Sequence, residues 1–99
     1  MILVIGHVKI APEKFAAARP HMRAMLEATR KEDGCLLYAF SEDVLEPGVI
    51  RIAERWTSWE TLKAHGGVPH MAAWRNALKE IGVLGREVIA WEAGEQRDL

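Results

Sequence analysis

The sequence predicts an α+β fold, in which an antiparallel sheet carries helices on one of its faces. Segments rich in β-branched residues alternate with segments whose apolar residues recur at helical spacing, in the order βαββαβ. Proline and glycine mark most of the boundaries between these segments. The chain has 99 residues, a length typical of one domain, so residues 1–99 are predicted to form a single unit.

The first part of the chain predicts a strand followed by a long helix. Residues 2–10, ILVIGHVKI, are rich in β-branched side chains, which is typical of a strand. Pro12 suits the first turn of a helix, where no N–H is needed. Pro20 should kink this helix or delay its regular part, and Gly34 is the expected left-handed stop. Residues that follow at helical spacing are Phe15, Ala18, Met22, Met25, Leu26 and Thr29.

Three further strands are predicted from apolar runs. CLLYAF (35–40) and VIRIAERW (49–56) are separated by a connection that contains Pro47 and Gly48, so they are expected to pair as an antiparallel hairpin. REVIAWEA (86–93) is the last strand.

The second helical region is predicted to be broken in two. TSWE matches a capping box, with Thr57 as N-cap and Glu60 three residues later. Gly66-Gly67 should stop this short helix, and Pro69 can start the next one. One face of that next helix carries Met71, Trp74, Leu78 and Ile81. The complete order is that of a ferredoxin-like sheet with its helices on one face.

Both faces of the predicted strands are apolar, although the helices can cover only one. Within residues 2–10, one side carries Leu3, Ile5 and His7, and the opposite side carries Ile2, Val4, Val8 and Ile10. Exposed apolar patches of this size are rare on monomers. We therefore expect a homodimer formed through the sheet faces, with two-fold symmetry.

Composition argues against several classes of partner. The formal net charge is −1 at pH 7, without the basic patch expected of a nucleic-acid-binding protein. Cys35 is the single cysteine and cannot form an internal disulfide, which fits a reducing compartment. No signal-peptide pattern is present, nor an apolar run of the roughly 18 residues that a membrane span needs. We expect a cytoplasmic protein with no nucleic-acid or membrane partner.

Two segments resemble the antibiotic biosynthesis monooxygenase superfamily, which includes small quinol monooxygenases. They are EDGCLLYAF (32–40) and ERWTSWETLKAHGGVPHMAAW (54–74). The resemblance implies a dimeric α/β barrel with a pocket between sheet and helices in each subunit. It also implies oxidation of phenolic rings by O2 without a metal, flavin or haem. The sequence departs from the family pattern at Pro20, and at Gly66 where a leucine is usual.

Cofactor-free oxidation needs a base, because O2 is a triplet and accepts an electron readily only from an ionised phenol. Histidine is the natural base near neutral pH. His7 is a candidate if its strand face meets the helices, the alternative being a structural core histidine. His70, in the first turn of a helix, is either the base or a turn residue. His65 is predicted to cap the end of its short helix and to touch the substrate, and His21 is expected at the surface.

Aromatic residues are expected to form a flat slot for a planar ring. Trp56 is in phase with the apolar residues of its strand and is the strongest pocket candidate, so we include it in the catalytic set. Tyr38, Phe40 and Trp74 are predicted substrate contacts, although such a set can equally be plain core. Glu54 shares the face of Trp56 and, if buried, needs a partner; Arg86 is one candidate.

No metal site is predicted. His65 and His70 are five residues apart, and glycines and a helix start lie between them, so they do not share one helical face. No matched third ligand is evident. We therefore expect no cofactor, and a small aromatic substrate with O2 as the ligands.

Two alternative functions remain open. Related small dimeric barrels degrade haem, and His7 and Trp56 occupy comparable places, but the expected position of an axial histidine holds Trp74 and Asn76 instead. A spectral shift on adding haemin would identify this activity. The other alternative is a non-catalytic domain that binds a small molecule.

Overall fold

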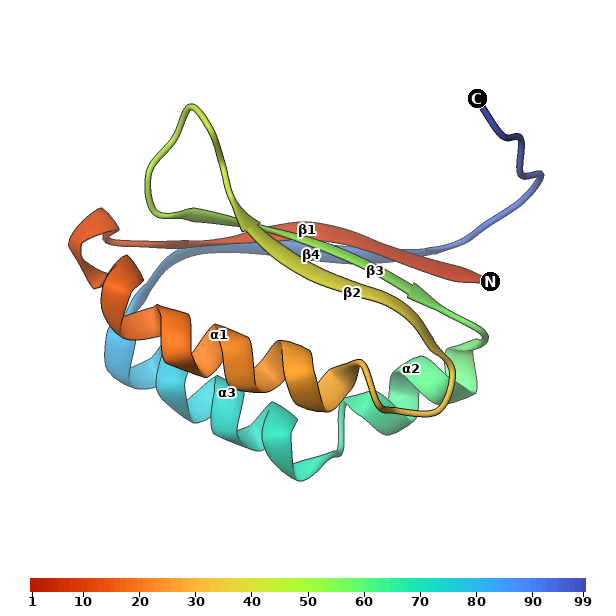
Figure 1. Ribbon diagram of the computed structural model, residues 1–99, viewed down its shortest axis with the longest axis horizontal. Coiled ribbons are helices and arrows are strands. Elements are labelled where there is room, and N and C mark those ends of the chain that lie inside the picture. The colour runs from red at the N-terminus through yellow and green to blue at the C-terminus, as the bar shows by residue number, and fades with distance from the viewer.

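A computed structural model describes residues 1–99, and the fold is a four-stranded antiparallel sheet with helices on one face (Figure 1). The elements are β1 (Ile2–Ile10), a 3-10 turn (Pro12–Lys14), α1 (Phe15–Thr29), β2 (Cys35–Glu42), β3 (Val49–Trp56), α2 (Trp59–His65), α3 (Pro69–Ile81) and β4 (Val83–Glu92). The strand order is β2-β3-β1-β4, with every neighbouring pair antiparallel. The predicted ferredoxin-like fold is confirmed.

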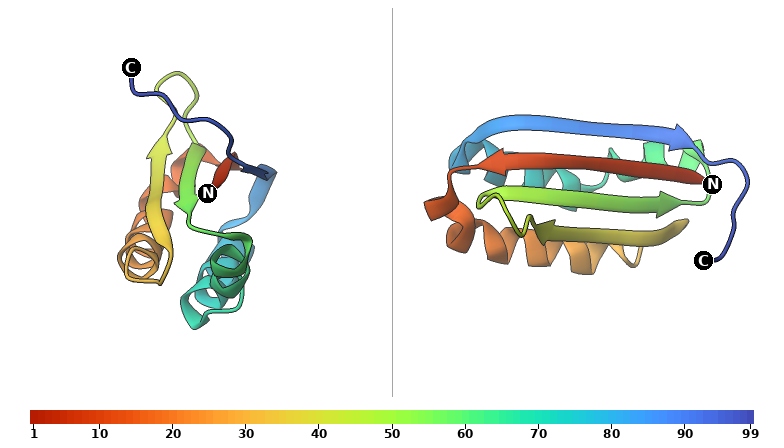
Figure 2. Two further views of the ribbon diagram at one scale, coloured as in Figure 1. Left: turned by 90° about the vertical axis from the view of Figure 1, so that its right-hand side faces the viewer. Right: turned by 90° about the horizontal axis from the view of Figure 1, so that it is seen from above.

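The helices form one layer, and the opposite face of the sheet is open. Figure 2 shows α1 and α3 side by side beneath the sheet, and all four strands uncovered when seen from above. The covered face holds the core, in which Ile10, Ile50 and Trp56 are completely buried. None of the helices is long and apolar enough to cross a membrane.

The open face of the sheet carries large apolar side chains. Ile5 is 53% exposed and lies opposite Ile89 on β4, which is 42% exposed. Leu37 and Trp91 are also exposed, and both belong to the same face by strand alternation. The two-sided apolar pattern of the strands is therefore present in the folded chain.

Two local predictions were wrong in detail. The N-cap of α2 is Ser58, one residue after Thr57: its Oγ accepts from the N–H of Thr61, and the Thr61 hydroxyl accepts from the N–H of Ser58. Ser58 has the extended backbone that an N-cap needs, whereas the N–H of Thr57 bonds Gly34. β4 begins at Val83 rather than Arg86, because Gly82, with φ of 92°, ends α3 and turns directly into the strand.

Pro20 lies inside α1: the helix begins before this residue and continues after it. A 3-10 turn at Pro12–Lys14 comes first, and α1 then runs through Pro20 without a break. Pro20 and Ala16, four residues earlier, are both exposed. The Ala16 carbonyl that loses its usual donor can therefore bond water, which lowers the cost of the proline.

Replacing Gly6 should test the packing between β1 and β4. A Cβ at Gly6 would lie 2.3 Å from the carbonyl oxygen of Glu87 and 2.6 Å from Cα of Val88, both backbone atoms. We expect Gly6→Ala to lower the free energy of unfolding by about 1–3 kcal/mol, measured by urea denaturation. Gly85→Ala is the control, because its Cβ would meet nothing closer than 3.8 Å. Equal stability of the two variants would contradict this account.

Candidate functional site

Two adjoining cavities lie between the sheet and helices α2 and α3, and share Glu54, Met71 and Val88 as walls. The first measures about 270 Å³ and is lined by Val8, Tyr38, Phe40, Ile52, Glu54, Met71, Trp74, Arg75, Leu78, Arg86 and Val88. The second measures about 230 Å³ and is lined by Val4, Glu54, Leu62, His65, Gly66, Met71, Val88 and Ala90. Together they form the sheet–helix cleft. A ligand pocket typically measures about 300–1,000 Å³, so the joined cavities suit a small molecule.

Glu54 is a buried carboxylate in the wall of both cavities. Strand alternation in β3 directs it, like Trp56, toward the helices. The indole Nε1–H of Trp56 donates to Glu54 Oε1 at 2.8 Å. Glu54 makes no ion pair, so the predicted partnership with Arg86 does not form. Burial raises the pKa of Glu54, and the charge of Glu32 adds to this; the Trp56 bond and His65 oppose it.

Glu32 joins two histidines from different helices. Its Oε2 lies 2.7 Å from Nδ1 of His65 and 2.8 Å from Nε2 of His70. A carboxylate only accepts hydrogen bonds, so the network places the proton of His65 on Nδ1 and that of His70 on Nε2. The other ring nitrogen of His65, Nε2, makes no hydrogen bond within the chain, and His65 lines the smaller cavity.

His65 is held on three sides. Its side chain is 4% exposed, and its ring lies 4.8 Å from that of Trp56 and 5.3 Å from that of Tyr38, measured between centroids. The predicted role as a helix cap was wrong, because the side chain bonds Glu32 rather than the last carbonyls of α2. A buried imidazole that is fixed by a carboxylate and has a free Nε2 has the features of a general base.

The turn at Gly34 positions Glu32. Gly34 has φ of +80°, and a Cβ there would lie 2.4 Å from Cγ2 of Thr61. Its carbonyl accepts from the N–H of Thr57 at 2.9 Å. The close approach that glycine permits brings the turn after α1 against α2, and with it the Glu32 carboxylate against His65.

Stacked aromatic rings form the other side of the cleft. Phe40 from β2 and Trp74 from α3 stack, with centroids 5.4 Å apart and planes 28° apart. Tyr38 lies 5.2 Å from Phe40 and 6.5 Å from Trp56, again between centroids. Burial, together with the charges of Glu54 and Glu32, raises the pKa of Tyr38, so its phenol stays protonated at neutral pH.

The comparisons with known proteins agree with this architecture. The family model described as antibiotic biosynthesis monooxygenase matches residues 1–77. The chain belongs to the antibiotic biosynthesis monooxygenase family.

Individual family members are similar over most of the chain. A crystal structure of a candidate antibiotic biosynthesis monooxygenase from Deinococcus radiodurans superposes with a TM-score of 0.93 at 34% identity, covering 100% of this chain and 98% of that one. Rv0793 of Mycobacterium tuberculosis, named as a candidate monooxygenase, is 32% identical over 81% of this chain and 78% of its own length. An uncharacterised protein from Synechocystis is 30% identical over 99% of this chain and 67% of its own length.

The structure brings most of the predicted site residues together. Tyr38, Phe40 and Trp74 line the larger cavity, His65 lines the smaller one, and Trp56 packs on His65 behind them. Trp56 is completely buried and faces the helices, as its phase in the strand indicates, but its prediction as the strongest pocket candidate was wrong because it lines neither cavity.

The two predicted bases, His7 and His70, both lie outside the sheet–helix cleft, in different places. His7 was a candidate only if its strand face met the helices, and that condition is not fulfilled: the covered face of β1 carries Ile2, Val4, Val8 and Ile10, so His7 lies on the open face. His70 bonds Glu32 and borders a small pocket of about 70 Å³ between α1 and α3 instead of the cleft.

Glu32, His65 and His70 could together hold a metal ion. Their ligand atoms all lie within 4.8 Å of one another. Two imidazoles and a carboxylate suit zinc or iron(II). The argument from sequence that a third ligand was missing was therefore wrong. Glu32 comes 33 residues before His65 in the chain, and only the fold brings the two side chains together.

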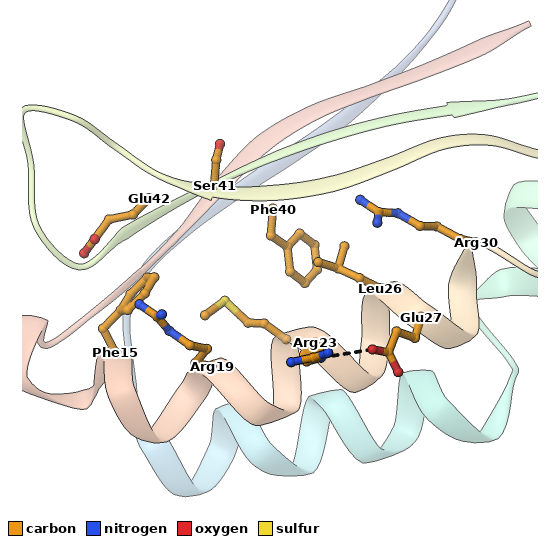
Figure 3. Close-up of a pocket in the computed structure, with 10 residues that line it drawn as sticks. Phe15, Arg19, Arg23, Leu26, Glu27, Arg30, Phe40, Ser41 and Glu42 are labelled. Carbon is orange, nitrogen blue, oxygen red and sulfur yellow. Dashed lines mark hydrogen bonds and ion pairs between the residues drawn. The ribbon is translucent and has the colours of Figure 1, made fainter.

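A separate groove lies outside the sheet–helix cleft, between α1 and β2, with a volume of about 440 Å³. Figure 3 shows Phe40 pointing from β2 toward α1, with Phe15 and Arg30 at opposite ends. Both acidic side chains of the groove already have partners: Glu27 forms an ion pair with Arg23, and Glu42 accepts a hydrogen bond from the N–H of Gly48. The groove contains no histidine, so we place the reactive site in the sheet–helix cleft.

Replacing Glu54 should change how stability depends on pH. A carboxyl whose folded-state pKa is raised above its ordinary value of 4.5 binds its proton more tightly in the folded chain. Its contribution to stability is therefore complete below pH 4.5 and is lost as pH rises through the raised pKa. We expect the unfolding free energy of Glu54→Gln to fall less than that of the wild type as pH rises above 4.5, measured by urea titrations.

Glu13→Gln serves as the control, because Glu13 is an exposed carboxylate in the 3-10 turn. It should follow the wild-type curve. A Glu54→Gln curve parallel to that of the wild type would show that Glu54 titrates alike in the folded and unfolded chains.

Proposed function

We propose that this chain is a cofactor-independent monooxygenase that oxidises a quinol or polycyclic phenol with O2. Membership of the monooxygenase family supports the reaction class. The observation that carries the proposal is the buried His65, fixed through Nδ1 by Glu32, with its free Nε2 at a cleft that also holds Glu54. A cofactor-free reaction of this kind needs a base and an acid in an otherwise apolar pocket, and these two groups meet that need.

The reaction begins by ionising the substrate. Nε2 of His65 takes the phenolic proton, and the Glu32 carboxylate stabilises the imidazolium that forms. The phenolate then gives one electron to O2, and the two radicals combine to form a carbon–oxygen bond. The stacked aromatic rings of Phe40 and Trp74 keep the planar substrate in position during this step.

The peroxide formed on the ring then breaks down. The peroxide first takes the phenolic proton back from His65, which then removes the hydrogen of the oxygenated carbon. Glu54, whose raised pKa favours its protonated form, gives a proton to the distal oxygen as the O–O bond breaks, and it recovers a proton from His65, which lines the same cavity. One oxygen atom stays on the ring as a carbonyl, and the other leaves as water with two hydrogens that come from the substrate. The substrate supplies all four electrons, so no external reductant is needed.

His70 and Trp56 support His65 in this proposal. His70 donates to the same oxygen of Glu32 and so keeps the carboxylate oriented toward His65. Trp56 packs on the imidazole and donates to Glu54, which fixes both the base and the acid. Each acts through another residue, in contrast to the direct catalytic role first assigned to them.

Oxygen uptake with a panel of hydroquinones and naphthols, with EDTA present, tests the activity. Removing the base should lower the rate by at least about 100-fold, so we expect this loss in His65→Gln. His21→Gln, which alters an exposed histidine of α1, should retain the wild-type rate. Uptake by none of the compounds would favour a non-catalytic binding domain, and full activity of His65→Gln would exclude His65 as the base.

A metal-dependent oxygenase is the second candidate, and the Glu32–His65–His70 cluster favours it. Two histidines and one carboxylate form the ligand set of many non-haem iron(II) oxygenases. The same assay distinguishes the two candidates: EDTA should leave a cofactor-free enzyme active, whereas a metal enzyme should lose activity and recover it when iron(II) is added back.

We also propose that the chain forms a homodimer through the open face of the sheet. The exposed Ile5, Leu37, Ile89 and Trp91 on that face are the support for this assembly. Burying them against a second copy would remove apolar surface from water, which is the main driving force of such interfaces.

Light scattering after size-exclusion chromatography tests the dimer. The wild type should show twice the 11.1 kDa mass of one chain. Ile5→Glu places a charge at the centre of the open face and should shift the mass toward that of one chain. Val44→Glu, on the β2–β3 connection and 97% exposed, should leave the dimer unchanged. A dimer that survives Ile5→Glu at micromolar concentration would rule out this face as the interface.

A further inference from the structure

The sheet–helix cleft is charged differently at its two ends. Arg75 from α3 and Arg86 from β4 line the larger cavity and are absent from the lining of the smaller one. His65 lines the smaller cavity only, and Glu54 lies where the two cavities meet. The cleft therefore runs from a cationic end, past a buried carboxyl, to an imidazole.

The two arginines have no carboxylate partner in the chain. Neither appears in any of the ion pairs, and the one hydrogen bond of this pair is from Arg75 Nη1 to the carbonyl of Gly66 at 3.3 Å. Arg86 lies opposite Val8 in the sheet, on the face that the helices cover. Two guanidinium groups at one end of an apolar cleft are suited to bind an anionic group of a ligand.

Glu54 determines which end of a ligand can carry negative charge. An anion beside this buried carboxyl would be poorly solvated, and Glu54 offers it no cationic partner. The anionic group must therefore lie at the arginine end, while an uncharged hydroxyl reaches Glu54 and His65. This geometry requires the two groups to stand at opposite ends of the ligand.

We infer that the substrate is a hydroxylated aromatic acid, with its carboxylate against Arg75 and Arg86 and its hydroxyl directed toward His65. The hydroxyl end of this inference rests on the proposed function, whereas the carboxylate end depends only on the arginines. The aromatic body lies against Met71 and the stacked pair of Phe40 and Trp74, which line the cavity between the two ends.

Calorimetric titration without oxygen tests this inference with three naphthalene probes. 6-Hydroxy-2-naphthoate carries its two groups at opposite ends, 3-hydroxy-2-naphthoate carries them side by side, and 2-naphthol lacks the carboxylate. We expect the 6-hydroxy acid to bind about tenfold more tightly than either of the others, as one charge-assisted contact would give. Equal affinity for the 6-hydroxy acid and 2-naphthol would overturn the inference, as would no binding of any probe.

Variants locate the site. Arg75→Met and Arg86→Met should each remove most of the tenfold preference and leave the affinity for 2-naphthol unchanged, because both side chains are exposed and their loss should not unfold the chain. Arg19→Met, in the groove between α1 and β2, is the matched control and should keep the preference. A preference lost in Arg19→Met and kept in the other two would assign binding to that groove instead.

Because the titration is done without oxygen, it does not depend on turnover. Tight binding of the 6-hydroxy acid with no oxygen uptake would refute the proposed activity and still support the inferred ligand class. Oxygen uptake with 2-naphthol alone, and no carboxylate preference in binding, would refute the inferred ligand class and still support the proposed activity.

Discussion

The helices cover only one face of the sheet, and the position of every functional side chain depends on this constraint. Side chains alternate between the two faces of a strand, so each position faces either the cleft or the open side. In β3 this places Glu54 in the cleft and Trp56 behind it against His65, and in β1 it places His7 outside. A shift of one residue in the register of either strand would exchange these groups, so the identity of the site is fixed by the sheet pairing.

The Glu32 carboxylate converts this cleft into a reactive site. One of its oxygens accepts from two rings that belong to the end of α2 and the start of α3. The break between these helices brings His65 and His70 to the same oxygen, which a continuous helix would not do for residues five apart. Hydrogen bonds to a partly buried carboxylate are stronger than neutral ones, so the broken helix gains both a fixed geometry and a stabilising contact.

Local patterns in the sequence predicted the elements and the aromatic wall, but not the groups that join distant segments. Periodicity was enough to assign Trp56, Phe40 and Trp74 to one interior. It could not decide the side of β1 that meets the helices, because both sides are apolar, and the orientation of His7 therefore remained open until the fold was known. Glu32 lies in a turn, where no periodicity indicates direction. Its contact with His65 depends on the positive φ of Gly34 and on the close approach of this turn to Thr61 of α2.

The two carboxyls of the site, Glu32 and Glu54, have opposite tasks because their surroundings differ. Glu32 accepts from two imidazoles and holds the ring of His65 in place. Glu54 has one neutral donor and is desolvated, which favours its uncharged form. A carboxyl kept in its uncharged form beside an imidazole lets one site supply both an acid and a base. In the proposed reaction, His65 therefore ionises the phenol and Glu54 protonates the peroxide, so both proton transfers use groups that the chain supplies.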